Sequence, residues 1–394
     1  MKIVYIIGTL ATQSGAARIV TEKMNLFASR LHYDITVITC IQHQNEKNTY
    51  PLSDTIKQIN LNIPFFSQYK YRYPKRIWVK WSLYRLMYDK ITKTVNHINP
   101  DIVIGFGQYH ADVISCIKSQ AKIIIECHEI RFLSLPGIKS YKPFPYSILY
   151  KLSKYRYYRT IEQHADAIAT LTEKDKLLWK KAKRVEVIPN FSMIQVNKVS
   201  DCTSKRIISI GRLEKEKGYE RLIEIWRIVS LKHPDWELDI FGEGSLQCTI
   251  DNIIKNDGVK NIEIHRFTNR ISQEYAKSSI CLVSSYYEGF SLVILEAMKH
   301  GVPCVAFDCP FGPSSIIQNN LNGFLINDGD INLFAERTCQ IIENQKMRKS
   351  FSQEAILRAQ AFDVSCVLNK WKALFEDLSK TYKNSASYNS AHIP

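Results

Sequence analysis

The sequence predicts an α/β protein of two domains, each built on a parallel β-sheet. The chain of 394 residues is too long for one ordinary hydrophobic core. Short apolar runs with β-branched residues, such as residues 280–283, alternate with helical periodicity and indicate buried parallel strands. The unit of strand, glycine turn and helix that opens the chain returns about 200 residues later, at residues 206–212.

The first half begins with an apolar strand over Lys2–Leu10 and a glycine turn, and the helix that follows runs to about Leu31. Helical periodicity also predicts helices over Ile77–Val95 and residues 110–118. The other predicted strands of this half are Asp34–Cys40, Asp101–Phe106, Lys122–Cys127, Ala167–Thr172 and Val185–Ile188.

A polar stretch with little periodicity, residues 191–204, indicates a linker. The strands predicted after it are Arg206–Ile210, Glu237–Phe241, Ile262–His265, Ile280–Val283, Pro303–Phe307 and Gly323–Leu325. An amphipathic pattern predicts a last helix at 365–382, and a polar, irregular tail follows at 383–394. We therefore divide the chain into domains at 1–195 and 196–364.

The composition is that of a globular protein, with 45% hydrophobic and 23% charged residues. The ten cysteines stand singly, without a C-x-x-C pair, and several fall in apolar strand patterns. This favours reduced thiols in a cytosolic protein over a structural zinc site. No apolar run reaches the roughly eighteen residues of a membrane span.

The net charge of +15 is concentrated in two stretches of the first domain. Residues 69–93, the first basic stretch, hold eight Lys and Arg against one acid, and residues 139–159, the second basic stretch, hold six and no acid. Each stretch also carries seven aromatic residues. A basic face with Trp and Tyr suits an anionic membrane surface. A solvated helix face and a nucleic-acid-binding surface are the alternatives.

Two carboxylates, Glu288 and Glu296, follow the strand at 280–283. Glu288 falls in the strand-to-helix loop, at the carboxyl edge of the sheet, where open α/β sheets bind ligands. Glu296 lies about one and a half turns into the helix. The helix start offers backbone N–H groups near residues 290–292 to phosphate oxygens. A single glutamate on a helix is usually a solvated charge, so the surroundings decide between the two interpretations.

The loop after the strand Arg206–Ile210 carries two cations, Arg212 and Lys217. At the carboxyl edge, facing a helix N-terminus, they would make a clamp for a leaving diphosphate, and a charged surface turn is the alternative. The G-x-G of residues 242–244 is a weak phosphate-loop signal. In the first domain, the strand Lys122–Cys127 delivers His128 to the corresponding edge.

These motifs stand in one order along the chain: Gly211-Arg212 with Lys217-Gly218, Phe241-Gly242-Glu243-Gly244, Glu288-Gly289-Phe290, Glu296-Ala297, Gly301-Val302-Pro303, Gly312-Pro313 and Asn322-Gly323. This order resembles the retaining, nucleotide-sugar-dependent glycosyltransferases of the GT-B fold, the bacterial group 1 type. The resemblance implies two Rossmann-like domains with parallel sheets facing across a cleft, and a C-terminal helix that crosses back to the first domain.

The resemblance also implies roles for the matching residues. Arg212 and Lys217 would hold the donor diphosphate, and Glu296 would bind the ribose hydroxyls. Glu288 would contact the donor sugar, and His128 would lie near its reacting carbon. The further substrate-binding positions that it implies are Gly15, whose missing side chain lets a loop approach the phosphates, and Gly242, Glu243, Phe267, Thr268, Gly289, Phe290, Ser291 and Leu292.

By this resemblance the chain is expected to be a retaining hexosyltransferase with a UDP-sugar favoured as donor and no metal or other cofactor. Its acceptor would be a lipid-linked or saccharide molecule of bacterial surface polysaccharide or glycolipid synthesis. We expect it at the cytoplasmic face of the membrane, docked through stretches 69–93 and 139–159. The alternatives are a sugar-nucleotide 2-epimerase of the same fold and a non-enzymatic nucleic-acid-binding protein, although we expect no nucleic-acid partner.

Overall fold

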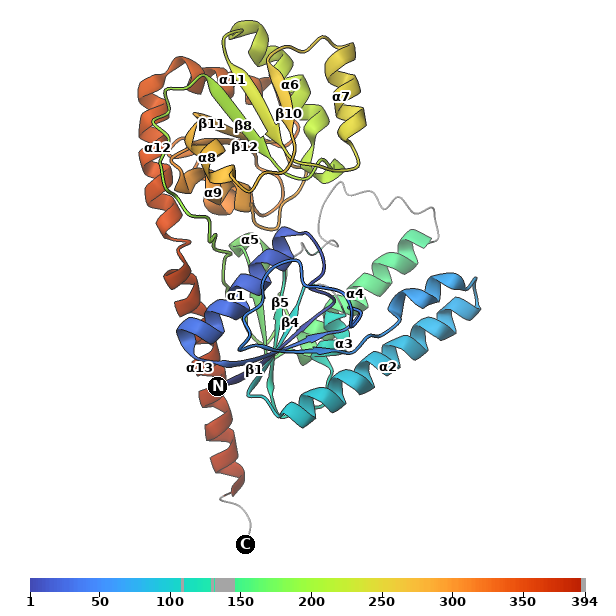
Figure 1. Ribbon diagram of the computed structural model, residues 1–394. Coiled ribbons are helices and arrows are strands. Elements are labelled where there is room, and N and C mark those ends of the chain that lie inside the picture. The colour runs from blue at the N-terminus through green and yellow to red at the C-terminus, as the bar shows by residue number, and fades with distance from the viewer. Residues whose placement is uncertain (108–109, 129–130, 132–145, 391–394) are drawn as a thin grey trace. The chain divides into compact units, whose positions relative to one another are not determined.

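The computed structural model describes residues 1–107, 110–128, 131 and 146–390. They form two compact units, each with a parallel sheet covered by helices (Figure 1). The first unit comprises Met1–Ile188 and the C-terminal residues from Leu368, and the second comprises Pro189–Val367. Residues 139–145 of the second basic stretch lie outside the described residues.

The described residues of the first unit form a seven-stranded sheet in the order β3-β2-β1-β4-β5-β6-β7, with every pairing parallel. Its inner strands are buried on both faces, which is why they appear in the sequence as continuous apolar runs. The edge strand β3 was not predicted, because its sequence KQIN has a single apolar residue. The strands are β1 (Lys2–Ile7), β2 (Asp34–Thr39), β3 (Lys57–Asn60), β4 (Ile102–Phe106), β5 (Lys122–Glu126), β6 (Ala167–Thr170) and β7 (Val185–Val187).

The first helix of this unit begins at a side-chain cap. Helix α1 starts after Ser14, whose hydroxyl accepts a hydrogen bond from the Ala17 N–H at 3.1 Å. The helices are α1 (Gly15–Leu31), η1 (Phe65–Lys70), α2 (Lys75–Ile98), α3 (Ala111–Ser115), α4 (Tyr146–His164), α5 (Glu173–Lys176) and α13 (Val364–Ser390).

The C-terminal helix α13 packs on α1 within the first unit. The Phe27 ring lies 5.9 Å from Trp371 and 5.4 Å from Phe375, centroid to centroid. The prediction of an irregular tail after residue 382 was wrong, since α13 continues to Ser390. This segment contains no Gly or Pro before Pro394, so nothing in its sequence stops the helix.

The described residues of the second unit form a six-stranded parallel sheet in the order β10-β9-β8-β11-β12-β13. The strands are β8 (Arg206–Ile210), β9 (Glu237–Phe241), β10 (Ile262–His265), β11 (Ile280–Val283), β12 (Cys304–Phe307) and β13 (Gly323–Ile326), close to the predicted bounds. The helices are η3 (Lys215–Lys217), α6 (Tyr219–Lys232), α7 (Gln247–Asn256), α8 (Ile271–Ala276), α9 (Leu292–Lys299), α10 (Pro313–Ile316), α11 (Ile331–Glu343) and α12 (Gln345–Gln360). The order reverses between β8 and β11, and such a switch point is where open α/β sheets bind ligands.

Candidate functional site

Glycines bring the loops at the carboxyl edge of the second sheet into contact. A Cβ on Gly242 would lie 1.9 Å from the carbonyl oxygen of Gly211, so the loops after β8 and β9 meet backbone to backbone. Gly218 has φ +65°, and its Cβ would lie 2.3 Å from the carbonyl oxygen of Ser284. The loop that carries Lys217 therefore lies directly against the end of β11.

This close approach places Lys217 against Glu288. The Lys217 ammonium lies 2.7 Å from Glu288 Oε1, and the Ser285 hydroxyl donates to the same oxygen at 2.8 Å. Both side chains are mostly buried, with 21% of Lys217 and 11% of Glu288 exposed. The Ser284 hydroxyl also donates to the Lys217 carbonyl at 3.0 Å, which fixes the loop. Two predicted site residues from loops 71 positions apart thus form one polar centre.

Arg212 takes a different position from the one predicted for a joint clamp with Lys217. Its guanidinium pairs with Glu216 at 2.7 Å, one helical turn along the same loop, and its side chain is 61% exposed. An exposed pair of this kind contributes little to stability, so Arg212 can exchange this partner at small cost. Lys217, in contrast, is held at the edge by its ion pair with Glu288.

The start of α9 lies beside this ion pair. Phe290 is buried against the Phe362 ring at 5.6 Å, and Ser291, the N-cap residue, is also buried. Among the described residues, the Ser291 side chain accepts no capping hydrogen bond, so the first-turn N–H groups are not satisfied by the cap. Gly289 and Leu292 are partly exposed on either side. This helix start suits an anion next to Lys217.

Glu296 lies one turn further along α9 and is almost fully buried. Its Oε1 accepts from the Ser192 hydroxyl at 3.1 Å, and the Lys299 ammonium donates to the Ser192 carbonyl at 2.8 Å. The segment after β7 is thereby anchored to α9. The partnership between Ser192 and Glu296 was not predicted, because 104 residues separate them.

Four of the predicted substrate-binding positions, Gly242, Glu243, Phe267 and Thr268, lie in the loops after β9 and β10. Phe267 is 75% exposed, so its ring is accessible for stacking. The Thr268 hydroxyl accepts from the Arg270 N–H at 3.1 Å, and the Glu243 carbonyl accepts from the Leu213 N–H at 2.9 Å. The first bond orders the backbone after the exposed ring, and the second joins the loop after β9 to the loop after β8.

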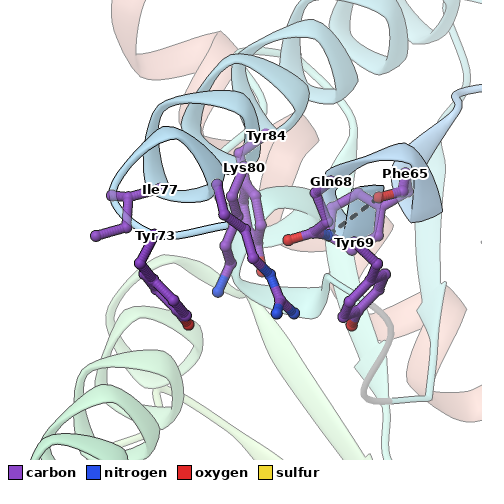
Figure 2. Close-up of a pocket in the computed structure, with 8 residues that line it drawn as sticks. Phe65, Gln68, Tyr69, Tyr73, Ile77, Lys80 and Tyr84 are labelled. Atoms are coloured by element: carbon purple, nitrogen blue, oxygen red, sulfur yellow. Dashed lines mark hydrogen bonds between the residues drawn. The ribbon is translucent and has the colours of Figure 1, made fainter. Parts of the chain in front are cut away.

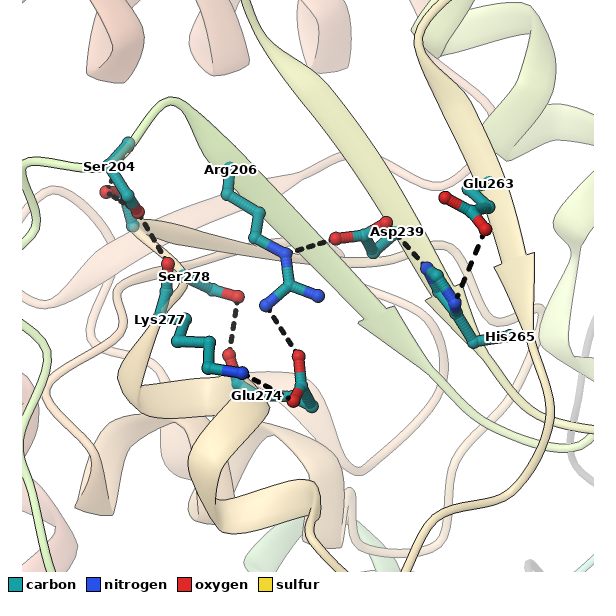
Figure 3. Close-up of polar contacts among 9 residues, drawn as sticks. Ser204, Arg206, Asp239, Glu263, His265, Glu274, Lys277 and Ser278 are labelled. Carbon is teal, nitrogen blue, oxygen red and sulfur yellow. Dashed lines mark hydrogen bonds and ion pairs between the residues drawn. The ribbon is translucent and has the colours of Figure 1, made fainter.

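A polar network that sequence reasoning missed supports the Phe267 loop (Figure 3). Arg206 forms ion pairs with Asp239 and, at 2.7 Å, with Glu274 on α8. His265 Nε2 lies 2.7 Å from Asp239 Oδ1, and its ring stacks on Phe241 at 4.6 Å. The network therefore ties the last residue of β10 to the neighbouring strands. The charged residues inside β8 and β9 were the available signal.

Three groups of this network could in principle hold a metal ion. The ligand atoms of Asp239, Glu263 and His265 lie within 4.8 Å of one another. However, Asp239 is already neutralised by the Arg206 guanidinium, as Figure 3 shows. The Arg206 guanidinium would repel a metal ion bound to Asp239, the most buried of the three ligands. We therefore assign the cluster a structural role.

In the first unit, His128 belongs to a buried charged triad with Lys23 and Glu126. Glu126 Oε1 lies 2.6 Å from His128 Nε2, and the Lys23 ammonium pairs with the same oxygen. All three side chains are at least 94% buried. Burial lowers the pKa of Lys23 and of His128, while Glu126 opposes both shifts. Burial works to raise the pKa of Glu126, but the two cationic partners hold it below the usual range.

The triad fixes how His128 is presented. Its ring lies 4.5 Å from Phe106, centroid to centroid, and its Nε2 bonds to Glu126, so Nδ1 is the ring nitrogen left for a ligand. Gly15 is exposed at the start of α1, which also supplies Lys23. Neither Lys23 nor Glu126 was predicted, since their meeting depends on packing across 103 residues.

Replacing Glu126 by Gln tests the triad. The substitution leaves the buried Lys23 ammonium without its counter-ion, so we expect the free energy of unfolding to fall by about 3 to 5 kcal/mol. Urea unfolding measures this change.

Glu186→Gln on β7, the edge strand of the same sheet, is the matched control. Its partner Arg184 is 32% exposed, so we expect a loss below about 1 kcal/mol. Equal losses in the two variants would contradict a special role for the buried triad.

About half of the chain is similar in sequence to known glycosyltransferases. Residues 193–358 match the family model described as "Glycosyl transferases group 1". An uncharacterized glycosyltransferase of Haemophilus influenzae is 32% identical over 215 residues, 53% of this chain and 61% of that protein. The amylovoran biosynthesis glycosyltransferase AmsD of Erwinia amylovora is 30% identical over 218 residues, 52% of this chain and 61% of that protein. The chain thus spans about three fifths of each of these relatives.

The fold also matches solved structures. A mutant of S. aureus TarM, in complex with fondaparinux, alpha-GlcNAc-glycerol and UDP, superposes with a TM-score of 0.73 at 16% identity. This match covers 95% of the present chain and 99% of that one. At this identity the similarity shows the fold, which includes both units.

Proposed function

We propose that this chain transfers a sugar from a nucleotide diphosphate sugar to a lipid-linked or saccharide acceptor of bacterial surface polysaccharide synthesis. Its residues 193–358 match the family model of the group 1 glycosyltransferases. The observation that carries this proposal is the Lys217–Glu288 pair beside the start of α9. It combines a fixed cation, backbone donors and a carboxylate at one sheet edge. The relative from Erwinia amylovora, named for amylovoran biosynthesis, supports the class of pathway.

The chemistry follows from what these groups can do. Lys217 and the first N–H groups of α9 would bind the donor diphosphate. They would also stabilise the negative charge that develops on the diphosphate when the bond between the anomeric carbon and the phosphate oxygen breaks. Glu288, once Lys217 turns to the phosphate, can accept a hydrogen bond from a donor-sugar hydroxyl. His128 would offer Nδ1 near the reacting carbon. Arg212 can leave Glu216 and reinforce Lys217.

The donor base would stack on the open Phe267 ring, and Glu296 would bind the ribose hydroxyls. We favour UDP-sugars because the TarM complex, a protein of the same fold, contains UDP. Lys217 supplies the positive charge that a metal provides in other transferases, so we expect no metal requirement.

A panel of nucleotide sugars tests donor binding through thermal stabilisation. We expect UDP-sugars to stabilise the protein most, since a ligand at one hundred times its Kd adds about 2.7 kcal/mol. Lys217→Gln and Glu296→Gln should lose at least about tenfold in affinity, because each removes a charge-assisted hydrogen bond.

Lys215→Gln is the matched control, since it removes an exposed charge from the same loop and should bind like the wild type. Unchanged stabilisation in the Lys217 and Glu296 variants would contradict the donor site. Conversion of a UDP-sugar into its 2-epimer without any acceptor would favour the epimerase alternative.

We further propose that transfer retains the anomeric configuration. The acceptor oxygen would attack from the face that the diphosphate leaves, and a phosphate oxygen would take the acceptor proton. The described edge brings Glu288 to Lys217, which suits it for donor binding, and the proposed route needs no nucleophilic carboxylate. NMR of the product should therefore show the donor's anomeric configuration, and an inverted product would exclude this route.

We also propose a peripheral position at the cytoplasmic face of the membrane. None of the described helices is long and apolar enough to cross a bilayer. The first basic stretch exposes large rings beside its cations: Tyr73 is 71%, Trp78 70% and Trp81 58% exposed. Aromatic rings and basic residues on one surface suit the headgroup region of an anionic membrane.

The topology of the first unit puts the start of this surface on the side of the sheet where His128 lies. A helix that connects two parallel strands starts at the carboxyl edge of the sheet, so α2 starts on the edge side where β5 delivers His128. The buried residues of α2, Leu83, Met87, Ile91 and Val95, lie in its later part, and Val79 is partly buried against the same core. A lipid-linked acceptor bound at the exposed start of α2 would thus lie on the carboxyl-edge side of this sheet.

A further inference from the structure

The segments η1 and α2 enclose a pocket of about 400 Å³ at the exposed end of the first basic stretch (Figure 2). Its volume lies in the range of small-ligand sites. The lining combines aromatic rings, one amide and two cations: Phe65, Gln68, Tyr69, Tyr73, Arg76, Ile77, Lys80 and Tyr84. We name it the η1–α2 pocket.

The floor of the pocket is fixed by packing. The rings of Phe65 and Tyr84 lie 4.3 and 4.9 Å from the buried His110 ring, centroid to centroid. Gln68 is almost fully buried, and its amide donates to the Phe65 carbonyl at 3.0 Å. Burial and the nearby Lys80 lower the pKa of His110 to about 4, so His110 adds no charge to the floor at neutral pH.

Two cations, Arg76 and Lys80, face into the pocket. Burial raises the pKa of the nearby Asp112 carboxyl, and Lys80 acts against this shift. The Arg76 guanidinium lies 4.3 Å from the centre of the Tyr69 ring and 5.7 Å from that of Tyr73. Lys80 lies 5.6 Å from the centre of the Tyr84 ring. In the part of the chain that the structure describes, no ion pair joins Arg76 or Lys80 to a carboxylate. A guanidinium over an aromatic face keeps its in-plane N–H groups, which are the donors that bind phosphate oxygens in pairs.

The rim of the pocket is apolar and exposed, unlike that of a site for a free anion. Tyr69 and Ile77, which line the pocket, are 60% and 57% exposed, and the Phe66 ring, 59% exposed, stacks on Tyr69. Free phosphate would gain nothing from such a rim. A phospholipid would use both parts, since its phosphate can reach the cations while the rings enter the interfacial layer.

We propose that the η1–α2 pocket binds the phosphodiester head group of an anionic membrane phospholipid, such as phosphatidylglycerol, with Arg76 and Lys80 on the phosphate and the exposed rings in the interface. This inference rests on the proposed membrane position, and it names the lipid that the protein would bind there. The protein recognises one lipid head group at a formed site, in addition to the general attraction of its positive charge. The bound lipid holds the start of α2, and with it the carboxyl edge of the first sheet, at the membrane.

The test compares two double variants with the same change of charge. Arg76→Gln/Lys80→Gln empties the pocket of cations, whereas Arg72→Gln/Lys75→Gln removes two exposed cations from the same end of α2 outside the pocket lining. Binding is measured by co-sedimentation with phosphatidylcholine vesicles, with and without 30 mol% phosphatidylglycerol. General electrostatics predicts the same loss for both, about thirty-fold from about 1 kcal/mol per basic residue. We expect the pocket variant to lose at least tenfold more than its control.

A soluble lipid separates pocket binding from surface attraction. Dihexanoyl phosphatidylglycerol, below its micellar concentration, should bind saturably to the wild type and to the control variant, and not to the pocket variant. Equal vesicle losses, or wild-type binding that does not depend on phosphatidylglycerol, would overturn the proposal. Inorganic phosphate that competes as well as the lipid would also overturn it, because that result identifies a free-anion site.

Stabilisation by UDP-sugars is measured on the same variants. It should be unchanged, since the donor residues lie in the second unit. Loss of lipid binding with intact donor binding thus tests the pocket alone. If neither the wild type nor any variant binds UDP-sugars, the proposed function is contradicted. The lipid-binding result is then judged separately, from the vesicle and soluble-lipid measurements. Circular dichroism confirms that each variant is folded.

Discussion

The ion pair between Lys217 and Glu288 is the interaction on which the account of the second unit depends. A mostly buried charged pair is costly unless its remaining hydrogen bonds are made, and here Ser285 satisfies the carboxylate while Ser284 fixes the lysine loop. The backbone contacts at Gly218 and Gly242 are what bring the loops close enough. A parallel sheet collects these loops at one edge, and the start of α9 adds backbone donors there.

Much of the fold could be predicted from the sequence, because strands buried on both faces appear as apolar runs. The strands β8 to β11 have the predicted bounds, and the predicted resemblance to group 1 glycosyltransferases with the GT-B fold is confirmed. The strand β3 is half polar, so the sequence shows no apolar run there. The predicted strand ends placed Lys217 and Glu288 in loops, but they did not predict that the two side chains pair. The Lys23–Glu126–His128 triad and the Arg206 network depend on side chains that meet only after folding, which local patterns cannot show.

The first unit contains both buried, paired charges and exposed cations. Lys23 is buried and neutralised by Glu126, where it fixes the presentation of His128. Arg76 and Lys80 lie beside aromatic rings at the start of α2, and among the described residues neither forms an ion pair with a carboxylate. Both groups belong to the carboxyl-edge side of one sheet, through β5 and the start of α2. The first unit thus carries an internally neutralised triad and a set of exposed cations on the same side of one sheet.

A crystal structure with bound UDP tests the central claim most directly. We predict that the diphosphate lies within hydrogen-bond distance of Lys217 Nζ and of the N–H groups at residues 290–292, with the uracil on Phe267 and the ribose hydroxyls on Glu296. Lys217 should then have left Glu288 for the phosphate. UDP bound without contact to Lys217 or to the start of α9 would contradict the account.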